Sequence, residues 1–290
     1  MDRFVRGAEL RDGAPTEPQF VLAGTGEDKI VAVLGVLTCE ILELEFGHLL
    51  STDGDVGRVT VLDDGQSARL LSRLESQRDG HLRRISRLDE FMPDRGSQTE
   101  ALVRVLELGL HIWPKKLREA LVQAADEMAL HVDALILGYG LCGNALEAPE
   151  KLLSDIGVPV FIPMDEDHPV DDCVGLLIGG RERYYAEQCK VAGTFFITPG
   201  WSSHWQRLFD LQTGGVSIEM AKRMFENYER TLVISSPVMS EEEMRQRIRE
   251  FVEMFGFRIE ACDGAMDILE RTWQEAKDSV QSQHKETPRE

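Results

Sequence analysis

The chain has 290 residues, enough for one large domain or two small ones, and 42% hydrophobic with 29% charged residues is the composition of a globular protein with a sizeable core. Its formal net charge of −19 repels phosphate backbones and argues against a nucleic-acid partner. No stretch approaches the roughly 20 apolar residues of a membrane span, and residues 1–28 lack the apolar segment of a signal peptide. We therefore expect a cytoplasmic protein with no membrane partner.

The first part of the chain contains one clear strand signal. Residues 1–28 mix proline, glycine and both charges, and we expect a weakly ordered lead-in there. The valine-rich run at 29–37 predicts a buried strand, and the spacing of leucine and glutamate at 40–50 predicts a helix after it. We place one α/β domain at 29–273 and a polar tail at 274–290.

Residues 51–96 differ in character from the rest of that domain. Asp-Gly steps at 53–54 and 64–65 predict turns, and residues 66–88 predict an amphipathic helix. The arginines of this predicted helix are at positions 69, 73, 78, 83, 84 and 87. We interpret the segment as an insertion on the sheet and its basic face as solvated, with a docking surface as the alternative.

From residue 97 onward, predicted strands and helices alternate. Strands are expected at 133–137, 158–162, 193–198, 231–235 and 257–261. Helices are expected at 97–109, 115–131, 145–155, 171–180, 181–190, 216–228 and 265–277, and after Ser240, which has Glu243 in the capping-box position. This alternation is typical of Rossmann-like βαβ units around a parallel sheet. One doubly wound sheet and two smaller pseudo-repeated halves both fit it.

Five cysteines, odd in number and widely spaced, do not form a disulfide framework in a reducing compartment. A special role for them would be metal ligation or catalysis as thiolates, and ordinary buried packing is the alternative. In open α/β sheets, ligands bind beyond the carboxyl ends of the strands. Cys39, Cys142 and Cys173 follow predicted strands at increasing distance. Cys189 lies inside a predicted helix, and Cys262 follows the last strand.

The loop that contains Cys142 is rich in glycine. Gly138, Gly140 and Gly143 permit unusual backbone angles and a close approach of a ligand, so we predict that they contact a cofactor. The loop has neither the G-x-G-x-x-G fingerprint nor the Lys-Ser/Thr of a P-loop, which weakens a nucleotide-binding interpretation. Cys173 lies near the start of a predicted helix, where the pKa of a thiol is lowered.

Polar and aromatic side chains at the other turns complete the predicted site. The candidate catalytic groups are His111, Tyr139, Asn144 and Trp201, and the further candidate cofactor-binding groups are Asp172 and Thr198. Each follows a strand or begins a helix at the edge where ligands bind. The alternative for each is that it only stabilises its own turn.

Several short motifs together resemble the uncharacterised family known as domain of unknown function 1638. They are CE at 39–40, HIWP at 111–114, GYGLCGN at 138–144, DDC at 171–173 with GLLIGG after it, and GTFFITPGW at 193–201. The resemblance covers roughly residues 29–264 and implies a three-cysteine α/β protein of largely anaerobic microbes, in some cases encoded beside corrinoid-dependent methyltransferases. The family often has His-Asp-Cys at the third site. Here Asp171 replaces that histidine, so its ligand role is not carried over, and we do not assign it to His168.

These observations favour a site in which Cys39, Cys142 and Cys173 bind a [4Fe–4S] cluster or a zinc ion and leave one coordination position open for a small-molecule substrate. The anaerobic character of the resembling family favours the cluster. One alternative is a metal-free enzyme with Cys142 as nucleophile and His111 or His168 as base. Another is an accessory or docking protein for corrinoid-dependent methyl transfer, which rests on the gene neighbourhood of that family.

Overall fold

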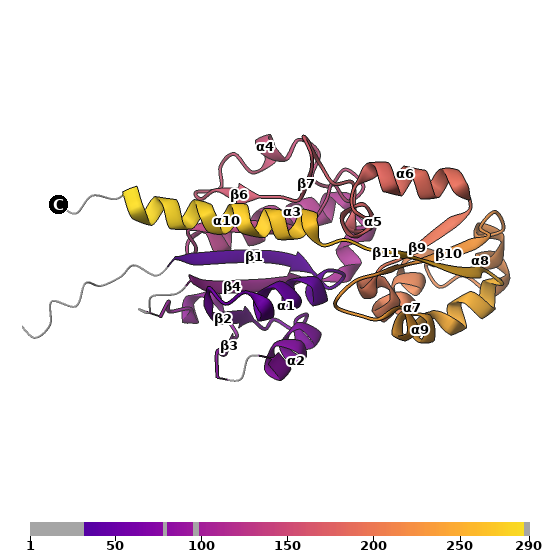
Figure 1. Cartoon of the computed structure of the whole chain (residues 1–290), viewed down its shortest axis with the longest axis horizontal. Helices are drawn as coiled ribbons and strands as arrows, with labels where there is room; N and C mark the ends of the chain where they lie inside the picture. The colour runs from indigo at the N-terminus through magenta and orange to yellow at the C-terminus, as the bar shows by residue number, and fades with distance from the viewer. Residues whose placement is uncertain (1–31, 78–79, 95–98, 287–290) are drawn as a thin grey trace, which may run out of the picture.

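A computed structural model describes residues 32–77, 80–94 and 99–286, so the predicted lead-in at 1–28 lies outside the described residues (Figure 1). It contains a six-stranded, all-parallel sheet, which confirms the predicted fold class. The strands are β1 (Val33–Cys39), β2 (Val56–Leu62), β3 (Leu82–Ile85), β4 (Thr99–Leu106), β5 (Ala134–Gly138) and β6 (Val160–Phe161), in the order β3-β2-β4-β1-β5-β6.

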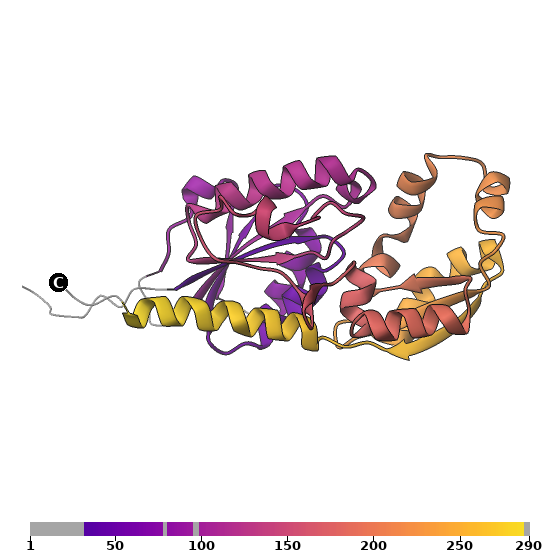
Figure 2. The same ribbon diagram turned by 90° about the horizontal axis from the view of Figure 1, so that it is seen from above.

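Helices cover both faces of this large sheet. The main ones are α1 (Glu43–Thr52), α2 (Ala68–Gln77), α3 (Pro114–Ala129) and α10 (Asp267–Glu286), with short turns at η1 (Leu88–Glu90), η2 (Leu108–Ile112) and α4 (Pro149–Leu152). Figure 2 shows α3 on one side of the strands and α10 on the other. Every residue of β1 and β5 is buried, as expected for parallel strands that are covered on both faces.

A smaller sheet lies beside the first. Its parallel strands are β9 (Thr194–Ile197), β10 (Arg230–Ser235) and β11 (Arg258–Asp263), in the order β11-β10-β9. Its neighbours in the chain are α5 (Cys173–Ile178), α6 (Arg181–Lys190), α7 (Pro199–Thr213), α8 (Ile218–Met224) and α9 (Glu241–Phe255), and a short antiparallel hairpin of β7 (Met164–Asp165) and β8 (His168–Pro169) precedes them. Ser240 caps α9 as predicted, since its side chain accepts a hydrogen bond from the Glu243 N–H.

The two faces of the small sheet carry different contacts. Phe195 packs against Trp201 of α7 and Phe251 of α9, with ring centroids 4.8 Å and 5.0 Å away. The next residue along the strand, Phe196, faces the opposite way and meets Tyr184 of α6 edge-on at 4.8 Å. The small sheet therefore has its own aromatic core between α7 and α9.

The chain returns from the small sheet to the large one through α10, which packs on β1, β5 and β6. Lys277 is 3% exposed, and its ammonium donates to Asp53 at 2.6 Å and Asp55 at 2.8 Å. The Trp273 indole also donates to Asp53, at 2.7 Å. These contacts fix α10 to the end of α1, and the helix runs well into the segment 274–290 that the sequence predicts as a polar tail. None of the described helices combines the length and the apolar character needed to cross a bilayer.

Three local predictions are wrong. The helix predicted at 97–109 is strand β4, and the single helix predicted at 66–88 is α2 followed by strand β3. The segment interpreted as an insertion thus supplies two of the six strands. Helix α7 was not predicted, although Thr198 caps it and Pro199 is its first residue.

Candidate functional site

Three loops bring the predicted cysteines to the carboxyl end of the large sheet. Cys39 is the last residue of β1, Cys142 lies in the turn after β5, and Cys173 is the first residue of α5. Strands β1 and β5 are neighbours, with Thr38 opposite Gly138, so the chain leaves both strands side by side. The first cysteine and the glycine-rich loop therefore occupy the same edge.

Backbone hydrogen bonds join the glycine-rich loop to the loop before α5. The Leu141 N–H donates to the Val170 carbonyl at 2.8 Å, and the Cys142 N–H donates to the Asp171 carbonyl at 2.8 Å. Gly140 permits this approach, because a Cβ there would lie 2.5 Å from the Val170 oxygen. The hydrogen-bond partner of Cys142 is thus two residues from Cys173.

The three thiols form one electrostatic group. Burial raises the pKa of Cys39 to about 12, and burial is also the largest cause of the raised pKa values of Cys142 and Cys173. Charge on Cys39 further raises the pKa of Cys142, and charges on Asp172, Cys39 and Cys142 further raise that of Cys173. Such mutual effects require groups that lie close together. At neutral pH the thiols are protonated, and a thiolate here needs a compensating positive charge.

Acidic side chains surround the thiols. Asp172 caps α5, since its Oδ1 accepts hydrogen bonds from the N–H groups of Val174 and Gly175, both at 2.9 Å. Burial raises the pKa of this carboxyl. Glu45 of α1 is fully buried, and its charge contributes to the raised pKa of Cys173. The surroundings favour a positively charged ligand.

Several buried polar atoms around the thiols have no hydrogen-bond partner among the described residues. They are Thr38 Oγ1, both carboxylate oxygens of Glu45, His111 Nε2 and the Tyr139 hydroxyl. Burial lowers the pKa of His111 to about 4, so its ring is neutral, and it stacks on Tyr139 with the centroids 5.8 Å apart. Buried polar groups in native proteins are nearly always paired, so these atoms are the ones for which a bound ligand would supply the missing partners.

The donor set can be tested against a metal. Three sulfurs in acidic surroundings suit a thiophilic cation, which deprotonates the thiols that it binds. Within the ranges that the structure describes, no three Cys, His, Asp or Glu side chains form a ready-made site for a single ion. Cys39, Cys142 and Cys173 are the residues that would hold a zinc ion or a [4Fe–4S] cluster, and a single ion would need their side chains to rearrange.

Comparison with known proteins gives one match. Residues 105–273 fit the model of the family described as a protein of unknown function (DUF1638). The chain belongs to this family. The match confirms the resemblance seen in the motifs, and it includes Cys142 and Cys173 but begins after Cys39. No curated protein and no solved structure matches the chain.

For other predicted residues of this DUF1638 chain, the structure shows contacts that do not involve the thiols. Asn144 is exposed with φ of 66°, and its carbonyl accepts a hydrogen bond from Arg118 at 2.9 Å. Gly143 has φ of 64° and only Pro114 nearby, so it shapes the turn. Trp201 packs in the aromatic core of the small sheet. Thr198 accepts a hydrogen bond from the Trp201 N–H at 3.2 Å, which is the role of a helix cap.

Gly138 has a packing role at the end of β5. A Cβ there would lie 2.2 Å from the ring of Phe46 and 2.8 Å from Thr38 Oγ1. A side chain at this position would displace α1 from the sheet. The residue therefore lets α1 approach the site, and no contact with a cofactor is needed to explain it.

The remaining cysteines lie on other elements. Cys189 is exposed on α6, and Cys262 is partly buried on β11. Burial is the main cause that raises the pKa of Cys262, and the charge of Glu187 raises it further while that of Arg183 lowers it. Neither residue contributes to the pKa shifts of the three site cysteines.

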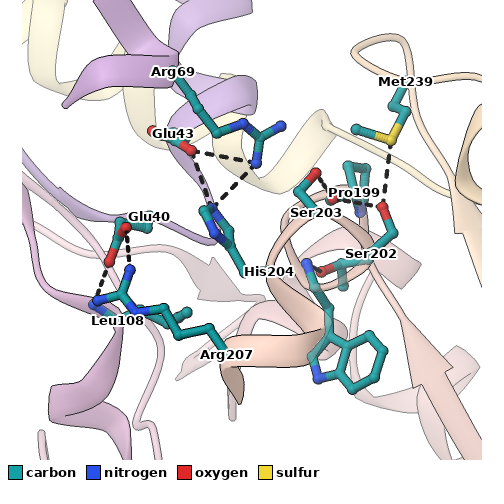
Figure 3. A network of polar contacts seen from close by, with 12 residues as sticks. Glu40, Glu43, Arg69, Leu108, Pro199, Ser202, Ser203, His204, Arg207 and Met239 are labelled. Atoms are coloured by element: carbon teal, nitrogen blue, oxygen red, sulfur yellow. Dashed lines mark hydrogen bonds and ion pairs between the residues drawn. The ribbon is translucent and has the colours of Figure 1, made fainter. Parts of the chain in front are cut away.

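Sequence reasoning missed the polar network that joins the two sheets beside Cys39 (Figure 3). Glu40 accepts from the Leu108 N–H and from Arg207 of α7, both at 2.7 Å. Glu43 lies 3.5 Å from Arg69 and 3.3 Å from His204 of α7. An ion pair between two elements this far apart in the sequence leaves no local signal.

Close backbone contact accompanies this network. A Cβ on Gly200, the second residue of α7, would lie 1.9 Å from the Ile41 carbonyl oxygen. Ile41 follows Cys39 by two residues, so α7 begins directly against the loop of the first cysteine. The small sheet thereby forms one wall of the site.

Tyr184 of α6 is a second residue that the sequence did not single out. It is partly buried, and burial is the main cause that raises its pKa to about 12, followed by the charges of Asp172 and Cys173. Its hydroxyl therefore lies near the third cysteine. The sequence predicts the helix at 181–190 that contains Tyr184, but not which face of that helix meets the site.

Proposed function

We propose that the chain is an enzyme that acts on a small molecule, with a [4Fe–4S] cluster or a zinc ion bound by Cys39, Cys142 and Cys173. The observation that carries the proposal is the gathering of three electrostatically coupled thiols beside unpartnered polar groups at the carboxyl end of one sheet. Three protein ligands leave a coordination position for substrate, where the metal acts as a Lewis acid.

The roles of the chain's own residues follow from their contacts. Asp172 holds the start of α5, and so orients Cys173, through its two backbone hydrogen bonds. The pairing of Cys142 with Asp171 fixes the distance between two of the loops. His111 and Tyr139 are neutral, and each has a polar atom that could hydrogen-bond to a ligand without adding charge to the site.

The metal-free alternative has less support. Burial raises the pKa of the Cys142 thiol, which reduces its nucleophilicity at neutral pH. The pKa of His111 is lowered to about 4, and no hydrogen bond in the described residues joins the Cys142 sulfur to a histidine. His168 instead places Nδ1 2.6 Å from the carbonyl oxygen of its neighbour Pro169.

A docking role in corrinoid-dependent methyl transfer stays a prediction, and the arginines at 69–87 give it little support. Arg69 lies 3.5 Å from Glu43 of α1 and 3.2 Å from His204 of α7, and Arg73 donates to the Val238 carbonyl at 3.4 Å. Arg84 pairs with Asp63. Much of the positive charge expected on a docking face is thus neutralised within the chain.

The decisive experiment is purification without oxygen, followed by visible absorption and by measurement of iron, zinc and sulfide per chain. The wild type should retain about one zinc ion or about four irons with four sulfides. Cys142→Ala should lose the metal, whereas Cys189→Ala, which removes an exposed thiol, should keep it. Equal metal contents in the two variants, or a wild type that retains and takes up neither metal, would contradict the proposal.

A further inference from the structure

Exposed apolar side chains are concentrated at one place on the small sheet. We call residues 211–228, from the end of α7 through α8 to the loop before β10, the α8 segment. Among the described residues, ten large hydrophobic side chains are exposed, and six of them lie in this segment. They are Leu211, Val216, Ile218, Met220, Met224 and Tyr228. Single exposed apolar residues are ordinary on a protein surface, whereas a cluster of them indicates an interaction site.

Helix α8 is packed against its own chain on one side only. It has seven residues, of which only Ala221 is buried. Ser217 caps its start, since the hydroxyl accepts a hydrogen bond from the Met220 N–H at 3.3 Å. Phe225, four residues after Ala221, packs on Phe255 with the ring centroids 5.0 Å apart. Residues four apart lie on the same face of a helix, so Ala221 and Phe225 form the inner face and the opposite face meets solvent.

Two rows of side chains make up the outer face of α8. Glu219 and Arg223 form the first row, because each is two residues, or about 200° of rotation, away from the buried Ala221. Met220 and Met224, which are also four residues apart, form the row beside it and are 48% and 53% exposed. The outer face therefore has a charged row, acidic at the start of the helix and basic at its end, next to an apolar row.

The charges of the α8 segment favour a second copy of this chain as the partner. The whole chain has a formal net charge of −19, which opposes contact between two copies over most of their surface. Within residues 211–228, by contrast, two acidic residues balance two basic ones. Two α8 helices packed antiparallel about a two-fold axis place Glu219 of each copy opposite Arg223 of the other, and Met220 opposite Met224. The outer face is thus complementary to itself.

We infer that the chain forms a two-fold dimer through the outer face of α8. Helix α8 lies at the end of the molecule away from the large sheet, so a second copy can reach it without meeting that sheet (Figure 1). The contact covers the methionine row, and the crossed Glu219–Arg223 pairs fix the antiparallel direction. One short helix gives a small interface, so the dimer should dissociate on dilution. The inference does not depend on the proposed function, since no cysteine lies in the α8 segment.

The first test follows the mass of the full-length chain by sedimentation over a series of concentrations. The wild type should approach twice the 32.7 kDa of one chain as its concentration rises. Met224→Glu places a carboxylate in the apolar row and should weaken dimerisation by about 10-fold or more. Met92→Glu makes the same change at an exposed methionine outside the segment, so this control should dimerise as the wild type does.

The second test uses charge reversal to identify the partner. Glu219→Arg and Arg223→Glu should each dimerise less than the wild type, because each makes the crossed pairs repulsive. An equal mixture of the two variants should dimerise again, since each chain then supplies the charge that the other needs. Thermal unfolding checks that the variants remain folded, as expected for changes at exposed side chains. A wild type that stays monomeric, a dimer unaffected by Met224→Glu, or a mixture that stays monomeric would overturn the inference.

Discussion

Two groups of buried polar side chains, one in each sheet, differ in how fully they are hydrogen-bonded. In the small sheet, Arg230 is 2% exposed, yet its guanidinium donates to Glu187 at 3.2 Å, to Glu260 at 2.8 Å and to the hydroxyl of Thr194. At the carboxyl end of the large sheet, the Tyr139 hydroxyl and several other buried polar atoms lack partners in the described residues. A closed network stabilises its own fold, whereas an open one indicates a position for a ligand.

The largest expected effect on stability comes from a substitution that disrupts the contact between α7 and the Cys39 loop. Gly200→Ala would force a Cβ to within 1.9 Å of the Ile41 carbonyl oxygen, and backbone cannot give way as a side chain can. We expect a loss of about 4 kcal/mol in the free energy of unfolding, measured with urea. Gly157→Ala, where a Cβ meets nothing within 4 Å, should cost less than about 1 kcal/mol. Similar losses in both variants would show that the contact between α7 and the Cys39 loop is loose.

The closed network can be opened by Arg230→Met. Removal of one partner from a buried, hydrogen-bonded ion pair leaves the other partners uncompensated, and we expect a loss of about 3 kcal/mol. Metal content should not change, because the small sheet's network does not include the thiols. Arg249→Met on the exposed face of α9 is the control, with an expected change below about 0.5 kcal/mol. A loss of metal in Arg230→Met would show that the Arg230 network and the thiol site are not independent of each other.

The open network predicts a pH dependence through Glu45. Burial raises the pKa of this carboxyl from 4.5 to about 8, so the folded state keeps a proton that the unfolded state releases between those values. Stability of the metal-free chain should therefore fall as pH rises, by about 2 kcal/mol from pH 5 to pH 7.

Glu45→Gln should remove most of that slope, because glutamine does not titrate. Urea unfolding at several pH values measures it, and Glu241→Gln on the exposed start of α9 should leave the slope as in the wild type. A flat wild-type profile would show that the Glu45 carboxyl is compensated in the folded state.

Strand ends were the most predictable part of the site. The runs at 29–37 and 133–137 identify β1 and β5 because strands buried on both faces have continuous apolar sequence, and the register of two parallel neighbours then places Cys39 near the loop of Cys142. Strand β4 was missed because its leucines and glutamates also fit helical spacing. This segment is a strand because it pairs with β1 and β2 on its two sides, which is a tertiary feature that the local sequence does not show.

The acidic part of the site could not be predicted in the same way. Glu43 and Glu45 lie in a helix whose residues from Glu43 to Gly47 are all buried, because α2 packs on one side of it and α7 of the small sheet on another. No pattern in the sequence of residues 40–50 reveals that α7, which begins at Pro199, packs against this helix. Likewise, Trp201 was expected in the site from its strand-end position, but its ring turns to the aromatic core of its own sheet.

The return of α10 to the large sheet has a consequence for synthesis of the protein. This helix covers β5 and anchors Lys277 between Asp53 and Asp55, yet it follows the entire small sheet in the chain. During translation, β1 to β6 must therefore wait with one apolar face uncovered while the small sheet is made. The large sheet consequently completes its packing last, after the whole of the small sheet has been synthesised.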